Sequence, residues 1–361
     1  MQPLLFSELE FPCVNKFPTT RYQGSKAKFV DWIWHEIEDI PFQTALDAFG
    51  GTGCVAYKLK DNGKTVTYND VLPFNSIIGK ALIENESTML DNSDVDYLIS
   101  EHSEIDYPTF IADNFKDIYY TDEENRWLDI VRYNIAAMSD EYKQAIAWFA
   151  LFQSCIIKRP YNLFHRKNLY VRLNDVKRTF GNKKTWDTSF ETHFRSFIEE
   201  ANNAVFDNGR KCKSLNHDAL SITGSYDLVY IDTPYINERG VGVDYADFYH
   251  FLNGLVNYER WAELIDYNSK HLRLKRTYNV WNDKENIMSG FKRLIERFSS
   301  SILVFSYRSN GIPSIASLIG LLEDYGRHSE LRFSRDMKYV LSDTKSKEVL
   351  IISYPPEENG G

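Results

Sequence analysis

Four consecutive residues, Asp232-Thr233-Pro234-Tyr235, directly follow the apolar run LVYI at residues 228–231. In an open α/β sheet, ligands bind in the crevice at the carboxyl ends of the strands, so a strand that ends in these residues places them in that crevice. Pro234 fixes its own φ and biases Thr233 toward an extended backbone, which makes the turn stiff. The four residues are therefore candidates for catalysis, and an ordinary turn after a strand is the alternative.

The chemistry that this group suits is reaction at an amino group on a purine ring. Such a nitrogen is a poor nucleophile because its lone pair is delocalised into the ring. The carboxylate of Asp232 and a neighbouring backbone carbonyl can accept both amino hydrogens, direct the lone pair at an electrophilic methyl group and stabilise the developing positive charge. Tyr235 can stack on the base, which must flip out of a duplex to reach such a pocket. This chemistry requires neither a metal nor a covalent nucleophile.

A second group, Asp47-Ala-Phe-Gly-Gly-Thr-Gly53, has the form of a loop that seats a cofactor. Its glycines allow a tight turn and a close approach of the backbone to a ligand. Asp70 follows Asp47 by 23 residues, near the spacing at which an acid binds ribose hydroxyls in dinucleotide folds. The loop matches neither G-x-x-x-x-G-K-[ST] nor G-x-G-x-x-G, which favours a cofactor containing a nucleoside but no pyrophosphate. A glycine turn without a ligand is the alternative.

These groups need a parallel sheet to position them. A helix predicted at residues 26–40 precedes strand 42–49, helix 53–63, strand 64–70 and helix 73–86, which is the opening of a doubly wound α/β sheet. Further strands are expected at the runs SYDLVYIDTPY, SSILVFSYRSNG and KEVLIISY, whereas RWLDIVRYNIAAM and EYKQAIAWFALFQSCII have helical patterns. We therefore predict an α/β catalytic domain of residues 1–83 and 216–361, interrupted by a helical insertion, 84–215.

The predicted insertion contains a strongly basic segment. Nine basic residues and one acid, Asp175, lie between positions 158 and 184, although the whole chain has a net charge of −9. Basic side chains neutralise phosphates, and aromatic residues among them can contact bases. The residues predicted to bind DNA are Lys158, Arg159, Arg166, Lys167, Arg172, Lys177 and Arg178, with Tyr161, Phe164, His165 and Tyr170 among them. A solvated basic loop is the alternative.

The rest of the sequence predicts a cytoplasmic protein. The four cysteines lack the C-x-x-C spacing of a zinc site, and their scatter does not suggest a disulfide framework. The first residues, MQPLLFSELEFP, contain acids where a signal peptide has a basic flank, and no stretch approaches the roughly 20 apolar residues of a membrane span. We expect no membrane association and no metal; the oligomeric state stays open.

Together, in this order, the motifs resemble the DNA adenine-N6 methyltransferases in which the cofactor motif precedes the catalytic motif, the group that includes the DNA adenine methylases. Arg21-Tyr-Gln-Gly-Ser-Lys26 is similar to R-Y-x-G-[ST]-K, Asp47 to Gly53 to D-x-F-x-G-x-G, and Asp232 to Tyr235 to D-P-P-Y. Tyr68-Asn-Asp70, Asn216-His-Asp218 and Ser306-Tyr307 also stand where the family has related segments. Thr233 departs from the usual proline, but its backbone carbonyl remains.

The resemblance implies a Rossmann-like fold that binds S-adenosylmethionine. The implied cofactor-binding residues are Tyr22, Lys26, Asp47, Phe49, Gly50, Gly51, Gly53, Asp70, Asp218 and Asp232. The implied reaction is methylation of adenine N6 in a specific double-stranded DNA sequence by base flipping into the D-T-P-Y pocket, with the insertion as target-recognition region. A restriction-modification system, with a cognate endonuclease as partner, is the implied setting.

Two other functions remain open. An RNA adenine methyltransferase would use the same chemistry, and a catalytically silent protein of this fold would bind nucleic acid or a partner. The resemblance also suggests that the segment 244–251 closes over the flipped base. Its periodicity predicts only a partly buried aromatic element, with Tyr245 as the one residue assigned to the base and His250 as a structural histidine.

Overall fold

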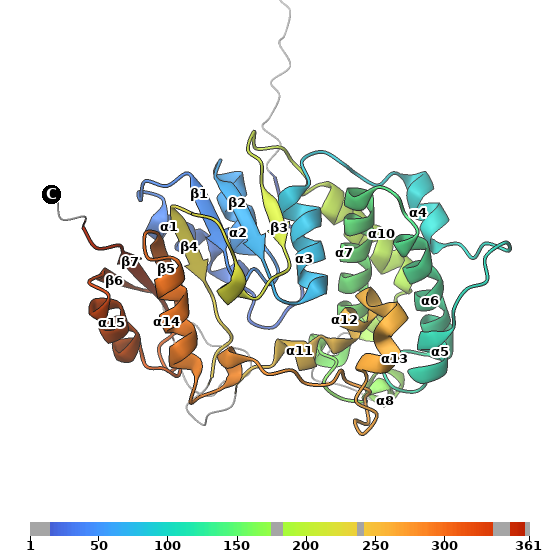
Figure 1. The fold of residues 1–361 in the computed structure, drawn as a ribbon. Coiled ribbons are helices and arrows are strands. Elements are labelled where there is room, and N and C mark those ends of the chain that lie inside the picture. The colour runs from blue at the N-terminus through green and yellow to red at the C-terminus, as the bar shows by residue number, and fades with distance from the viewer. Residues whose placement is uncertain (1–14, 175–182, 237–241, 335–346, 358–361) are drawn as a thin grey trace, which may run out of the picture.

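In the computed structural model, which describes residues 15–174, 183–236, 242–334 and 347–357, a seven-stranded sheet forms the centre of the molecule (Figure 1). The strand order is β3-β2-β1-β4-β5-β7-β6; β1 to β5 are parallel, and β7 is antiparallel to both of its neighbours. The strands are β1 (Thr44–Asp47), β2 (Thr65–Asn69), β3 (Lys213–Leu215), β4 (Leu228–Ile231), β5 (Ile302–Arg308), β6 (His328–Phe333) and β7 (Glu348–Tyr354). The order reverses between β1 and β4, and this switch point is where α/β sheets bind ligands. The predicted doubly wound fold is confirmed.

Helices cover both faces of the sheet. Successive residues of β4 point to opposite faces: Leu228 and Tyr230 belong to one core, and Val229 and Ile231 belong to the other. The first core contains the apolar sides of α1 (Val30–Ile37), α2 (Cys54–Asp61) and α3 (Pro73–Gly79), and the second contains those of α14 (Ile287–Arg297) and α15 (Ile315–Asp324). Because both faces are buried, β4 is apolar throughout, which is why it was recognisable in the sequence.

A helical layer packs beside α3 (Figure 1). Most of it comes from the predicted insertion: α4 (Asn92–Ile99), α5 (Phe110–Asn114), α6 (Asp122–Ala136), α7 (Glu141–Ile157), α8 (Leu169–Leu173), α9 (Lys183–Asp187) and α10 (Phe190–Asn202). The remainder, α11 (Tyr245–Phe248), α12 (His250–Val256) and α13 (Trp261–Leu264), lies in the catalytic flank of the sequence. The short helices are η1 (Lys26–Lys28), η2 (Lys80–Glu84, a π-helix), η3 (Pro160–Asn162), η4 (Ala219–Ser221), η5 (Tyr258–Arg260) and η6 (Val280–Asn282).

Contacts between these segments cross the predicted domain boundaries. The Tyr258 hydroxyl donates a hydrogen bond to the Asp129 carboxylate, and the Phe251 ring stacks on Phe164 at 5.2 Å. The region 245–264 therefore packs with the insertion, although it lies in the range assigned to the catalytic domain. Conversely, β3 belongs to the sheet through its pairing with β2, although its residues lie in the range assigned to the insertion.

Local signals determine several ends of the elements. The Asp140 side chain accepts hydrogen bonds from the backbone of Tyr142 and Lys143, so α7 begins where its helical pattern was predicted to begin. Ser306 and Tyr307 lie within β5. Strand β6 was not predicted. Among the described residues, no helix is long and apolar enough to span a membrane.

Candidate active site

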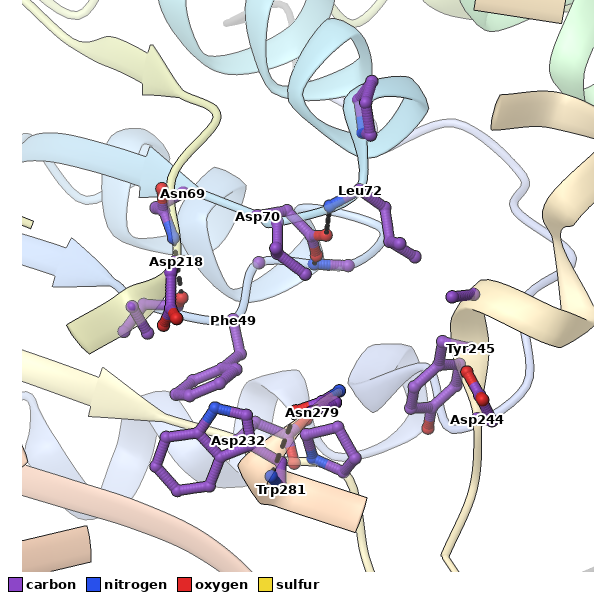
Figure 2. A pocket seen from close by; sticks show the side chains of 18 of the residues that line it. Phe49, Asn69, Asp70, Leu72, Asp218, Asp232, Asp244, Tyr245, Asn279 and Trp281 are labelled. Carbon is purple, nitrogen blue, oxygen red and sulfur yellow. Dashed lines mark hydrogen bonds between the residues drawn. The ribbon is translucent and has the colours of Figure 1, made fainter. Parts of the chain in front are cut away.

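A cavity of about 630 Å³ opens at the carboxyl ends of β1, β2 and β4, on the side of the switch point where ligands were expected. In Figure 2, Asn69 and Asp218 lie on one side of the cavity, and Asp244 and Tyr245 lie on the other. Many residues predicted to form the site line this cavity: Tyr22, Lys26, Asp47, Phe49, Gly50, Gly51, Asp70, Asp218, Asp232 and Pro234. The fold thus brings the cofactor loop and the catalytic turn to one space.

The glycine loop lies between β1 and α2 and depends on three glycines. Gly51 and Gly53 have φ values of +52° and +79°, which favour glycine. Glycine is required at position 50 for a different reason, because a Cβ there would lie 2.0 Å from the ring of Tyr68, which is fully buried. The Tyr68 hydroxyl also donates to the Gly51 carbonyl at 2.7 Å. The loop is therefore held closely against the end of β2.

Acidic groups from three strand ends surround the cavity. Asp70 accepts hydrogen bonds from the backbone of Gly51 at 2.9 Å and of Leu72 at 2.8 Å, and burial raises its pKa to about 6. Asp47 is 1% exposed, and its Oδ1 has no hydrogen-bond partner among the described residues. Burial, followed by the charges of Asp232 and Asp70, raises the pKa of Asp47 to about 8. Three carboxyl groups in one partly apolar cavity favour a ligand that carries positive charge.

The catalytic turn is joined to the start of the chain. The Lys26 ammonium lies 2.9 Å from Asp232 Oδ1 and 2.6 Å from the Tyr235 hydroxyl, which in turn lies 2.9 Å from Asp232 Oδ1. Burial raises the pKa of Asp232, although the charge of Lys26 opposes this effect. Thr233 is buried, and its hydroxyl has no partner in the described residues. The N-terminal motif therefore contributes directly to the catalytic turn.

Aromatic rings form another wall. The ring of Tyr22 stacks on Tyr249 at 4.4 Å and on Tyr245 at 5.4 Å, and Asp244 caps the start of α11. His250 is fully buried, with Nε2 2.7 Å from the Tyr119 hydroxyl, and burial lowers its pKa to about 3. A neutral, packed imidazole agrees with the structural role expected for His250.

Comparison with known proteins identifies the chain. Residues 22–299 match the family described as D12 class N6 adenine-specific DNA methyltransferase. The chain belongs to this family. Similar proteins are the type II methyltransferase M2.HphI of Haemophilus parahaemolyticus, 29% identical over 86% of this chain and 89% of that protein, M.FokI of Planomicrobium okeanokoites, 25% identical over 91% and 50%, and M.NlaIII of Neisseria lactamica, 22% identical over 85% and 89%.

The methyltransferase buries part of the segment that was expected to contact DNA. Lys158 and Arg172 both bind Glu124, at 2.9 and 2.6 Å, and are 2% and 5% exposed. Arg159 is 1% exposed, donates to the Tyr119 carbonyl at 3.0 Å, and its pKa is lowered to about 10 by burial. The prediction that these three cations contact DNA is corrected, because their charged groups are enclosed by protein partners.

Other residues of the basic segment have different positions. Arg166 and Lys167 are exposed, as are Tyr161 and Tyr170, at 55% and 63%. Phe164 is fully buried, and His165 is half-buried. Lys177 and Arg178 lie outside the described residues. The exposed residues of the segment that the structure describes therefore lie in η3, in the turn before α8, in α8 and at the start of α9.

Trp281 and Glu348 are among the residues of the methyltransferase site that sequence reasoning missed. Trp281, from η6, lines the cavity. Its ring packs edge-to-face against the Phe49 ring, with the ring centroids 5.1 Å apart. Glu348, the first residue of β7, is fully buried with an oxygen 3.1 Å from the Lys26 ammonium. An acid at the start of the apolar run VLIISY was a usable signal for Glu348, because a buried acid requires a partner. The position of Trp281 had no such signal.

Proposed function

We propose that this methyltransferase transfers a methyl group from S-adenosylmethionine to N6 of an adenine that is extruded from a specific double-stranded DNA sequence. The observation that carries the proposal is that one cavity is lined both by the cofactor-loop residues Phe49 and Asp70 and by Asp232 of the catalytic turn. The cofactor supplies an electrophilic methyl group next to a positively charged sulfur. The chain supplies the acceptors that orient the amine.

The cavity fits this cofactor in charge and shape. S-adenosylmethionine carries a sulfonium and an ammonium group, and their charges would compensate the buried carboxylates of Asp47 and Asp70. Asp70 would hold the ribose, Phe49 would contact the adenine ring, and Asp218 would bind near its amino group. Asp47 Oδ1, which has no partner within the described part of the chain, is an acceptor that a ligand can satisfy.

Asp232 would orient the substrate amine. The hydrogen bonds from Lys26 and Tyr235 both end on Oδ1, so we assign Oδ2 to one N6 hydrogen and the backbone carbonyl of Thr233 to the other. This pair of acceptors pyramidalises the nitrogen and stabilises the positive charge that develops on it. Pro234 keeps the turn stiff, and the Tyr235 ring would stack on the base.

DNA would approach the exposed part of the basic segment. Arg166 and Lys167 can neutralise phosphates, and the exposed rings of Tyr161 and Tyr170 can contact bases. The predicted roles of Lys177 and Arg178 stay part of this proposal. The relatives are named type II methyltransferases, which supports a role in a restriction-modification system with a cognate endonuclease as partner.

The test is transfer of labelled methyl from S-adenosylmethionine to unmethylated genomic DNA and to RNA, followed by nucleoside analysis. We expect N6-methyladenine in DNA alone. Asp232→Ala should lower the transfer rate at least about 10³-fold while calorimetry shows cofactor binding largely unchanged, since its carboxylate acts mainly in the transition state. Transfer at the wild-type rate by this variant would refute the mechanism, and label in RNA but not DNA would refute the substrate.

A further inference from the structure

The buried carboxylate of Glu348 belongs to a strand far from the catalytic turn in sequence, yet it contacts the same two side chains as Asp232. Its Oε1 lies 3.1 Å from the Lys26 ammonium and 3.1 Å from the Tyr235 hydroxyl. The corresponding distances to Asp232 Oδ1 are both 2.9 Å. Two donors are therefore shared almost equally between two acids.

A tyrosine hydroxyl has one proton and can donate it to one acceptor at a time. When Tyr235 donates to Asp232, it occupies the acid that has to accept hydrogens from the substrate. A buried hydroxyl that gave up Asp232 without another acceptor would lose a hydrogen bond at considerable cost. Glu348 is such an acceptor, at nearly the same distance.

The position of Glu348 is fixed independently of the catalytic turn. It pairs with Arg308 across β5 and β7, and its backbone N–H donates to the Ser334 hydroxyl at 3.1 Å. The Ser306 hydroxyl, on β5, donates to Glu348 Oε1 at 2.6 Å. The carboxylate is fully buried, so its placement is determined by the sheet.

We propose that Glu348 is a positioning residue for methyl transfer, an inference that rests on the proposed function. Glu348 receives the hydrogen bonds of Lys26 and Tyr235 when Asp232 engages the adenine amine. The exchange needs no large movement, because both donors already lie within hydrogen-bond distance of both acids. The second negative charge also keeps the Lys26 ammonium in place when Asp232 turns to the substrate. Glu348 itself contacts neither base nor cofactor in this assignment.

The charge of Glu348 gives the proposal a readout in pH. It contributes to raising the pKa of Asp232, after burial and against the opposing charge of Lys26. Removal of that charge should lower this pKa, and the acidic limb of the pH–rate profile should move to lower pH. Among the described residues, the titratable or charged groups around Asp232 come from seven elements and the catalytic turn. They are Lys26 from η1, Asp47 from β1, Asp70 after β2, Tyr230 from β4, Tyr235, Tyr245 from α11, Arg308 from β5 and Glu348 from β7.

The experiment is single-turnover methyl transfer to DNA by Glu348→Gln, measured across pH. We expect the plateau rate to fall about 10- to 100-fold, because the substitution removes a charged acceptor of hydrogen bonds from Lys26 and Tyr235. The affinities for cofactor and DNA should stay close to those of the wild type. The acidic limb should shift to lower pH. Glu330→Gln, on the neighbouring strand β6 and hydrogen-bonded to Arg332, is the matched control and should behave like the wild type.

A second variant tests whether Glu348 acts through Tyr235. In a Tyr235→Phe background the hydroxyl is absent, so Glu348→Gln should have a clearly smaller effect than in the wild type. Wild-type rate and an unmoved acidic limb in Glu348→Gln would overturn the inference, as would equal effects in both backgrounds. If Glu348→Gln does not fold, Glu348→Asp is tested in its place, because its shorter side chain withdraws the acceptor. A normal rate in Glu348→Asp would also overturn the inference. Absence of transfer by the wild type would refute the proposed function itself.

Discussion

Two arginines six positions apart in the basic segment should respond in opposite ways to the same substitution. Arg172 makes two hydrogen bonds to Glu124, at 2.6 and 2.9 Å, and a third to the Tyr119 carbonyl at 3.1 Å. Arg166 is exposed. We predict that Arg172→Met destabilises the fold, whereas Arg166→Met weakens DNA binding.

The magnitude for Arg172 follows from what remains after the substitution. Loss of one member of a buried ion pair costs about 3–5 kcal/mol, because the other charge is left without compensation. Glu124 would keep Lys158 at 2.9 Å, so we expect a loss of about 2–4 kcal/mol in the free energy of unfolding. Burial favours a higher pKa for Glu124, but the hydrogen bonds and charge of Arg172, with Lys158, hold the pKa below its ordinary value. The stabilisation is therefore present at neutral pH and lost as pH falls. The free energies of unfolding of the wild type and Arg172→Met should therefore converge in acid.

The assay is urea unfolding combined with DNA affinity over a range of salt. Arg166→Met should keep the wild-type midpoint and reduce the slope of log affinity against log salt by about 0.9, the value for one lost phosphate contact. Arg172→Met should lower the midpoint and, where still folded, keep the salt slope. If Arg172→Met instead kept the midpoint and reduced the slope, the assignment of Arg172 to the interior would be refuted.

Two further predictions concern the cofactor loop. Gly50→Ala should lower the free energy of unfolding by at least about 2 kcal/mol, because the new Cβ would lie 2.0 Å from the buried ring of Tyr68. Denaturant unfolding should show a smaller loss when the same substitution is made in a Tyr68→Leu background. An equal loss in both backgrounds would contradict the steric argument. Without cofactor, Asp47→Asn should become more stable relative to the wild type as pH rises from about 5 to 8. The fold raises the pKa of Asp47 to about 8, so the wild type loses stability in that window by up to about 1.4 kcal/mol per pH unit; a difference that does not change with pH would rule this out.

The sequence by itself predicted five of the described strands and the acids that end or directly follow β1, β2 and β4. The run LVYI is apolar at every position because both faces of β4 are covered, and the acid that ends it lies at the switch point for a topological reason. The glycine loop was recognisable because positive φ values restrict residue choice locally. The short, partly polar edge strands β3 and β6 were not recognised, since their residues lack an apolar run.

Only the tertiary structure decided which charges face solvent and which distant residues meet. Arg159 and Arg166 are alike in sequence, but Arg159 is enclosed by carbonyl groups and aromatic rings, and local composition cannot reveal such partners. Glu348 reaches Asp232 because β7 pairs beside β5, which itself pairs beside β4. Strand pairing brings together residues more than a hundred positions apart, and the side chains that meet there leave no periodic pattern in the chain. Spacing therefore indicates which residues end a strand, whereas the contacts between strands determine what those residues bind.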